Sequence, residues 1–248
     1  MPSTSEVGHA KNVANFADLI AYCTAYGATY NPSKANLQLP NLNTLLSTAQ
    51  TEITNVATAK NAFDMATGNR QLTFEPFKSL ATKILNALSV TDATEQTIAD
   101  ARTLNYKLQG RRANNTTANP TPENGNSGTP QNTTASVSRQ SYDTLTENFS
   151  ALIDLVAAVP SYTPNETELT IASLTNYLQE LQTANNNVIT EEVAYSNARI
   201  SRNNVLYTKD TGLVDTAQDI KNYVKSIFGA TSAQYRQISG IKFTNRTD

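Results

Sequence analysis

Histidine and cysteine, the residues that most often supply bases, nucleophiles and metal ligands, occur once each in this chain of 248 residues. His9 lies in a polar leading segment, whereas Cys23 lies in an apolar run that is typical of a helix. One histidine excludes zinc sites built from several histidines, and one cysteine excludes an intrachain disulfide. We therefore expect Cys23 to be a small buried hydrophobic residue and His9 to be exposed or at an interface.

Acidic residues suggest no better catalytic or metal site. Helical bundles bind paired metal ions through Glu-x-x-His motifs, and the sequence contains none. Glu191 and Glu192 are adjacent, so they cannot share a helix face, and the corresponding residues of the first half are Ala59 and Lys60. The glycines form no phosphate-binding loop. We predict no catalytic, cofactor-binding or metal-binding residue, and therefore no enzyme activity.

Basic residues near the predicted helix ends are the candidate interaction residues. Cations at a helix C-terminus are stabilised by the macrodipole, by about 0.3–1 kcal/mol each, and this effect explains most of the pattern. The alternative is a repeated site for an anion, a carboxylate or a neighbouring subunit. The candidates are Arg102, Lys107 and Arg111 in the first half and Arg236, Lys242 and Arg246 in the second. Arg70 and Arg202 also correspond, each near the end of a long helix.

Two long helices are expected to position these residues. Apolar residues recur every seven positions over residues 36–67, and the same pattern returns 132 positions later. This spacing is typical of long helices that pack side by side. The first series is Leu42, Ala49, Val56 and Phe63, with Leu46 and Ile53 on the same face; the second is Leu174, Leu181, Val188 and Tyr195, with Leu178.

The correspondence between the two halves extends to the neighbouring segments. Asn15-Phe16 matches Asn148-Phe149, and the turn at Tyr30 matches the turn at Tyr162. We therefore predict an all-α fold made by tandem duplication of an antiparallel four-helix-bundle-like module with long heptad-patterned helices. The predicted organisation is a flexible N-terminal arm at 1–10, a helical repeat at 11–112, an Asn/Thr/Pro/Gly-rich linker at 113–138 and a second helical repeat at 139–248.

Local signals predict where the helices of the first repeat begin and end. Gly27 is expected to end the first helix, which starts at residue 11 or 12, and Gly68 with Asn69 is expected to end the long helix. Asp92, followed three residues later by Glu95, predicts the start of the fourth helix as a capping box. The last helix of the second repeat is expected to include Ile241 to Phe243, as the first repeat ends in Tyr106 to Leu108.

Composition limits the classes of partner. Charged residues make up 16% of the chain and the net charge is -2, so no strong field attracts nucleic acid, and we expect no nucleic-acid partner. Asn and Thr are roughly a quarter of the residues, well above ordinary usage, so the polar surface is largely uncharged and repels copies of itself weakly. No membrane span or signal peptide is predicted. The default location is the cytoplasm, with leaderless export to the cell surface left open.

Several segments resemble a family of proteins of unknown activity from Bacteroidetes-type bacteria. The segments are residues 5–16 (SEVGHAKNVANF), 30–34 (YNPSK), 197–207 (beginning NARI) and 212–215 (GLVD). The resemblance covers both halves and implies a bacterial source and an internally duplicated, all-helical fold. It implies no catalytic residue.

Three classes of function remain open at this point. The favoured hypothesis is a structural or interaction protein that forms a homo-oligomer or a larger assembly, such as a ring, tube, filament or lattice, because two similar modules present similar faces twice. The second is a helical-bundle binding module for a small ligand or a protein partner. The third is an enzyme that uses carboxylates or tyrosines in an arrangement that the spacing does not reveal.

Overall fold

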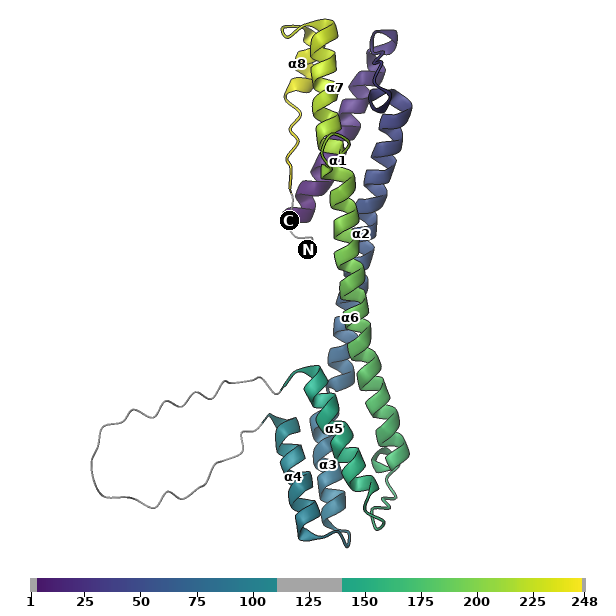
Figure 1. The fold of residues 1–248 in the computed structure, drawn as a ribbon, viewed down its shortest axis with the longest axis vertical. Coiled ribbons are helices and arrows are strands. Elements are labelled where there is room, and N and C mark those ends of the chain that lie inside the picture. The colour runs from purple at the N-terminus through teal and green to yellow at the C-terminus, as the bar shows by residue number, and fades with distance from the viewer. Residues whose placement is uncertain (1–3, 111–139, 247–248) are drawn as a thin grey trace, which may run out of the picture. The chain divides into compact units, whose positions relative to one another are not determined.

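The structure is a computed structural model that describes residues 4–110 and 140–246, with side chains from residue 8 onward. The predicted linker, 113–138, and Arg111 lie outside the described residues. Within those residues the protein is all-helical, with no strand (Figure 1). Its α-helices are α1 (Thr4–Ala25), α2 (Leu39–Phe74), α3 (Phe77–Ser89), α4 (Glu95–Gln109), α5 (Tyr142–Ala157), α6 (Ile171–Tyr207), α7 (Leu213–Phe228) and α8 (Ala233–Ser239).

Several predicted helix ends are wrong. α1 begins at Thr4, so residues 4–10 are helical and do not form the predicted flexible arm. α2 continues through Gly68 to Phe74, because one glycine costs a helix only about 1 kcal/mol, which is small for a helix of 36 residues. The N-cap of α4 is Thr94, whose side chain accepts from the backbone N–H of Thr97, and not Asp92.

The chain forms two compact units, and their boundaries differ from those of the predicted modules. Unit 1 contains Met1–Met65 and Thr190–Asp248, and unit 2 contains Ala66–Ile189. The predicted modules are divided at the linker, 113–138, whereas the compact units are divided within α2 and within α6. The physical reason is the length of α2 and α6: each begins in one unit and ends in the other, so each unit combines helices from both halves of the sequence.

Unit 1 has a continuous apolar core. α1 presents Phe16, Leu19 and Cys23 at the spacing of one helix face, and all three are fully buried. They pack with residues from both long helices and from α7. The buried core of unit 1 comprises Val13, Phe16, Leu19, Ile20, Cys23, Tyr30, Leu37, Leu42, Ala49, Leu206, Leu213, Ala217, Ile220, Val224 and Ile238.

Unit 2 has a comparable core with more aromatic contacts. The ring of Phe149 in α5 lies 5.2 Å from that of Phe77 and 5.9 Å from that of Tyr177, both in edge-on orientation. Leu174 and Leu181 of α6 are fully buried in the same core. These contacts hold α3, α5 and the first part of α6 together.

Two tyrosines make the same hydrogen bond in the two units. The Tyr30 hydroxyl donates to the backbone carbonyl of Leu37 at 2.9 Å, and the Tyr162 hydroxyl donates to that of Leu169 at 3.1 Å. Both hydroxyls are buried, and burial raises the pKa of Tyr162 to about 12. Each bond closes the turn that precedes a long helix, at positions that the sequence comparison of the two halves had paired.

Cys23 is buried as predicted, and burial raises the pKa of its thiol from 9.0 to about 12. Because the thiolate is the reactive species, we expect native protein to react with a thiol reagent at pH 8.5 at least about a hundredfold more slowly than protein in denaturant. Since the folded state holds this proton more tightly, the stability it contributes is present below pH 9 and is lost as pH rises towards 12. Equal labelling rates with and without denaturant would contradict the burial of Cys23.

Candidate functional site

The structure separates the predicted basic residues. In unit 2, Arg102 is exposed on α4, and the Lys107 carbonyl accepts a hydrogen bond from the Gln140 side chain at 2.9 Å. In unit 1, Arg236 lies on α8, whereas Lys242 and Arg246 lie beyond it in an extended segment. The structure therefore gathers no single basic cluster from the described candidates.

The extended segment, residues 241–246, replaces the predicted continuation of the last helix. α8 ends at Ser239 with Gly240 as its C-cap, and the chain then runs along α1 and α7 (Figure 1). At about 3.3 Å per residue, such a segment spans on the order of 16 Å, so Arg236 and Arg246 point to different parts of the unit. The Arg246 guanidinium packs directly against Gly8 of α1, where a Cβ would collide with it.

Two buried asparagines of α1 hold the backbone of the extended segment. The Asn12 side chain donates to the Thr244 carbonyl at 2.7 Å and accepts from the Thr244 N–H at 3.1 Å. The Asn15 side chain donates to the Lys242 carbonyl at 2.6 Å. Only 2% of Asn12 and 8% of Asn15 is exposed, so these hydrogen bonds are shielded from water on the side of α1.

A lysine of α7 also contacts the extended segment. The Lys221 ammonium donates to the Ile241 carbonyl and lies 5.4 Å from the centre of the Phe243 ring, within the range of a cation–π interaction. Burial lowers the pKa of Lys221. Ile241 and Phe243 are half-buried against the core, while Lys242 between them is exposed.

These contacts form the surface on which the chain's own extended segment docks, which we call the segment groove: Asn12 and Asn15 of α1, Lys221 of α7 and the core residues under Ile241 and Phe243. Its three polar side chains bind backbone carbonyl and N–H groups, and its apolar surface takes alternate side chains. This is the chemistry of extended-peptide recognition. The sequence did not reveal it, because two asparagines in an asparagine-rich chain carry no distinctive signal.

His9 lies beside the segment groove and is buried, so of the two expectations, exposed or at an interface, the first is wrong. Its ring is fully buried, and Nδ1 lies 2.6 Å from the Tyr207 hydroxyl, which also accepts from Asn12 at 3.2 Å. Arg202, one turn before the end of α6, is also fully buried and donates to the Asn203 side chain. Because His9 and Arg202 have no exposed surface, they support the fold rather than contact a substrate.

Arg70 has a similar inward position in unit 2. Its Nη1 donates to the Asn185 side chain at 3.0 Å, and its guanidinium lies 4.0 Å from the centre of the Tyr142 ring. Tyr142 in turn contacts Phe74 edge-on at 4.7 Å. Although Arg70 is close to a helix end, as the sequence indicated, it is used for packing within the unit.

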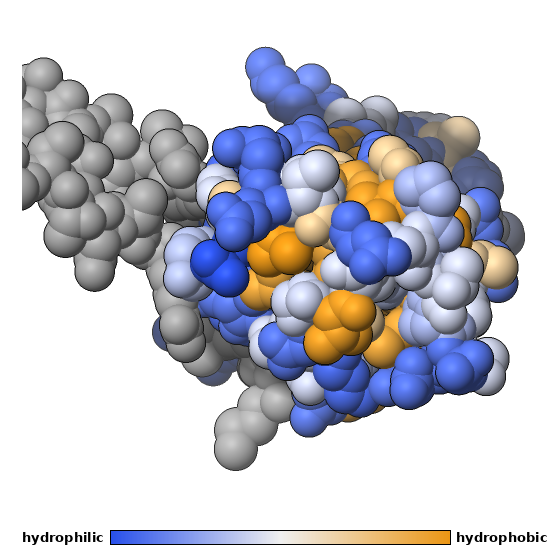
Figure 2. Space-filling model, turned by 90° about the horizontal axis from the view of Figure 1, so that it is seen from below, coloured by the Kyte–Doolittle hydropathy of each residue, from blue (hydrophilic) through white to orange (hydrophobic). Residues whose placement is uncertain are grey.

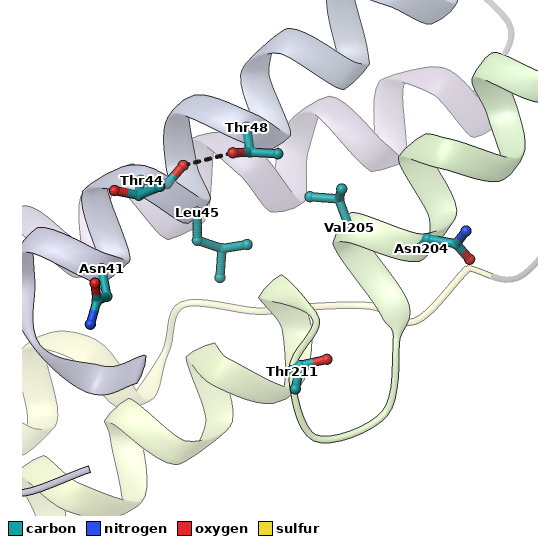
Figure 3. A pocket seen from close by; sticks show the side chains of 7 residues that line it. All are labelled: Asn41, Thr44, Leu45, Thr48, Asn204, Val205 and Thr211. Carbon is teal, nitrogen blue, oxygen red and sulfur yellow. Dashed lines mark hydrogen bonds between the residues drawn. The ribbon is translucent and has the colours of Figure 1, made fainter. Parts of the chain in front are cut away.

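An open hollow of unit 1 is lined by neutral side chains. It has a volume of about 530 Å³ and lies between α2, the end of α6 and the loop before α7 (Figure 3). The Thr48 hydroxyl is already used, since it donates to the Thr44 carbonyl at 3.0 Å. The hollow offers hydroxyl, amide and aliphatic groups but no acid, base or nucleophilic thiol. Its lining residues are Asn41, Thr44, Leu45, Thr48, Asn204, Val205 and Thr211.

Unit 2 has further open hollows, and two of them lie beside exposed apolar residues. One, of about 540 Å³, lies at the end where α3 meets the loop after α5, beside Val90, which is 86% exposed. The other, of about 710 Å³, lies beside the exposed Leu72 and the ring of Phe74. Figure 2, which views the molecule from below, shows apolar areas scattered among hydrophilic ones on that face. The hollow beside Val90 is also lined by Lys83 and Glu168, which form an exposed ion pair at 2.8 Å.

A second candidate interface lies where the long helices have no buried core. We call it the paired-helix stretch: residues 57–65 of α2 and 190–201 of α6, all in unit 1. None of these residues, all of which the structure describes, is buried. The rings of Phe63 and Tyr195 stack at 6.3 Å, while Val193 and Ile200 on α6 are 54% and 56% exposed.

The described residues hold neither a metal-ion cluster nor a helix that could span a membrane. Among them, no group of three or more His, Cys, Asp or Glu side chains is placed to hold a metal ion. None of the helices in residues 4–110 and 140–246 has the length and apolar character needed to cross a membrane.

Comparisons with known protein families, with curated proteins and with solved structures find no match for this chain. The interpretation of the two candidate surfaces therefore rests on their geometry.

Proposed function

We propose that the protein is a non-enzymatic structural or interaction protein that self-associates through the paired-helix stretch. The observation that supports this proposal is the exposure of Val193 and Ile200 beside the half-buried stack of Phe63 and Tyr195. Helices are stabilised mainly by burying an apolar face against other elements, and two helices alone bury little. The same stretch of a second copy would supply two further helices and complete a four-helix arrangement.

The charges of the paired-helix stretch are compatible with a second copy. The stretch contains two cationic residues, Lys60 and Arg199, and three anionic residues, Asp64, Glu191 and Glu192. Lys60 and Asp64 already form an ion pair at 2.6 Å on the helix surface. Because the local charges nearly cancel, two copies approach each other with little repulsion.

We also propose that the chain is a tandem duplication with heptad-patterned long helices. The matching hydrogen bonds of Tyr30 and Tyr162 support this, as does the burial of Leu42 and Leu174 at corresponding positions. Duplication supports assembly because two related surfaces on one chain allow repeated contacts with further copies. A bacterial source and a cytoplasmic location remain predictions from the sequence.

A second candidate function is the binding of a small neutral molecule. The observation that favours it is the hollow of about 530 Å³ in unit 1, with its hydroxyl and amide lining (Figure 3). A hollow of this size falls in the range of small-molecule sites. A polar, uncharged compound that stabilises the protein against heat, with no effect on a Thr44→Val variant, would support this alternative.

The proposed contact is tested by replacing Val193 and Ile200 together with asparagine. Asparagine has a helix propensity similar to that of valine and isoleucine, so α6 is expected to form. Loss of two apolar anchors is expected to weaken self-association at least about tenfold, measured by analytical ultracentrifugation. Val90→Asn is the matched control, because it makes the same change at an exposed residue of unit 2. A double variant that associates as tightly as the native protein would rule out this surface.

A further inference from the structure

We infer that the second copy binds antiparallel to the first, with α6 packed against α6. Val193 of one copy then lies opposite Ile200 of the other. On one flank of this contact, Glu192 of each copy lies opposite Arg199 of the other. This inference rests on the proposed self-association, and it adds the orientation of the second copy and the residues that select it. The two α6 helices lie at the centre of the resulting four-helix arrangement.

Val193 and Ile200 form one apolar face of α6. They are seven residues apart, so they lie two turns and roughly 10 Å apart on the same side of the helix. Both are more than half exposed, and Ser196 between them is also exposed. Tyr195 points to another side of α6, where its ring stacks on Phe63 of α2. The apolar face is therefore accessible to a second copy and is not occupied by α2.

A charged residue directly precedes each member of the apolar pair. Glu192 precedes Val193 in the chain. Arg199 precedes Ile200, so the two charges lie seven residues apart on the same flank of the apolar face. An antiparallel partner presents the same flank in the reverse order, so a glutamate meets an arginine at both ends of the contact. Charged residues beside an apolar helix seam set the orientation of the partner in this way. A parallel partner presents its other flank, where the nearest residue, Asn197, is uncharged.

The charges of α2 follow the same order along the paired-helix stretch. α2 and α6 run in opposite directions, because the first residues of α2 share a core with the last residues of α6 (Figure 1). Lys60 therefore lies towards the end that holds Arg199, and Asp64 lies towards the end that holds Glu191 and Glu192. One end is cationic and the other is anionic. Antiparallel copies bring opposite charges together and parallel copies bring like charges together, so electrostatic energy favours the antiparallel arrangement.

Charge reversal on α6 tests the orientation. Glu192→Arg alone and Arg199→Glu alone each place like charges against one another at both ends of an antiparallel contact. Each is expected to weaken self-association at least about fivefold in about 0.1 M salt, measured by analytical ultracentrifugation. The matched control is Glu191→Arg, which makes the same change at the neighbouring residue, on another side of α6. This control is expected to change the association less than about twofold.

The double swap, Glu192→Arg with Arg199→Glu, keeps the composition and the net charge of the native protein. It restores opposite charges at both ends of an antiparallel contact, so it is expected to associate with itself within about twofold of the native protein. Because it carries both substitutions, its association also shows that neither of them prevents folding. A double swap that associates as weakly as the single variants would contradict the assigned pairing of Glu192 with Arg199.

Mixing native and double-swap chains decides between the two orientations. In an antiparallel pair, glutamate of the native chain meets glutamate of the swapped chain, and arginine meets arginine. In a parallel pair, the native and swapped ends have opposite charges and attract. Fluorophore-labelled native protein at trace concentration is therefore expected to bind unlabelled native protein at least about fivefold more tightly than the unlabelled double swap. Equal or tighter binding to the double swap would show that the antiparallel orientation is wrong.

Failure of the orientation differs from failure of the proposed self-association. If native protein associates and Val193→Asn with Ile200→Asn abolishes this, but the charge reversals change nothing, the paired-helix stretch is the contact and the antiparallel inference is refuted. If labelled native protein binds neither unlabelled form up to about 200 μM, both are refuted.

Discussion

Leu181→Asp is expected to unfold unit 2. Leu181 is fully buried on α6 and packs in one core with Phe77 and Phe149. An aspartate there would have to bury an unpaired charge or take up a proton, and it would leave the apolar contacts of leucine unfilled. We expect a loss of at least about 4 kcal/mol, which is comparable with the whole stability of many domains. Val56→Asp, at a residue of unit 1 that is 2% exposed, is expected to have a similar effect on its own unit.

Circular dichroism at 222 nm during heating measures this loss. The matched control is Gln182→Asp, which places the same residue at the next position of α6, where the side chain is exposed. The control is expected to melt within a few degrees of the native protein, because surface substitutions usually change stability by no more than about 0.5 kcal/mol. An unchanged melt for Leu181→Asp would disprove the predicted packing of the heptad positions.

Phe16→Ala and Phe149→Ala are expected to have large and similar effects. The sequence pairs these residues between the two halves, and each is fully buried, Phe16 in unit 1 and Phe149 in unit 2. Removing a buried phenylalanine side chain costs about 3–5 kcal/mol, from lost burial and from the cavity that remains. Similar losses follow if the two units are related by duplication.

Urea unfolding followed by fluorescence of the tyrosines measures both losses. Thr24→Ala and Asp154→Asn serve as controls, because they change exposed positions of the same helices, α1 and α5, and leave both cores intact. A loss below about 1 kcal/mol for one phenylalanine and a large loss for the other would contradict the equivalence of the two cores.

The sequence predicted the helical class and much of the buried surface. Leu42, Ala49 and Val56 on α2 are buried, as their spacing indicated. This part was predictable because the spacing of apolar residues is the main sequence signal of which helix face is buried. The ends of the helices were less predictable. Gly27 and Gly68 were both expected to end a helix. Of the two, only Gly27 has a positive φ, of 58°, and follows the end of a helix.

The pairing of helices between the two halves could not be predicted from the pattern. If the halves are related, a helix from either half presents nearly the same face to its partners, so packing within one half and packing across halves satisfy the same apolar spacing. The length of α2 and α6 determines which of the two packings forms. The sequence did not predict the full length of α2, because Gly68 was expected to end this helix and instead lies inside it.

The segment groove was unpredictable for a related reason. Ile241, Lys242 and Phe243 fit the end of a helix as well as they fit an extended segment, and the difference lies in Asn12, Asn15 and Lys221, which are distant in the sequence. His9 was expected to be exposed or at an interface because its neighbours are polar, but its ring is buried and lies within hydrogen-bond distance of the Tyr207 hydroxyl. Long-range polar contacts of this kind leave no periodic trace.

Size-exclusion chromatography with light scattering, over protein concentrations from about 1 to 200 μM, tests the proposed self-association most directly. We expect a molar mass that rises with concentration to at least twice the chain mass of 26.9 kDa, because the exposed face of α6 gains a partner as copies become abundant. Negative-stain microscopy of the same fractions would show whether the product is closed or extended. A molar mass of 26.9 kDa at every concentration would contradict the account.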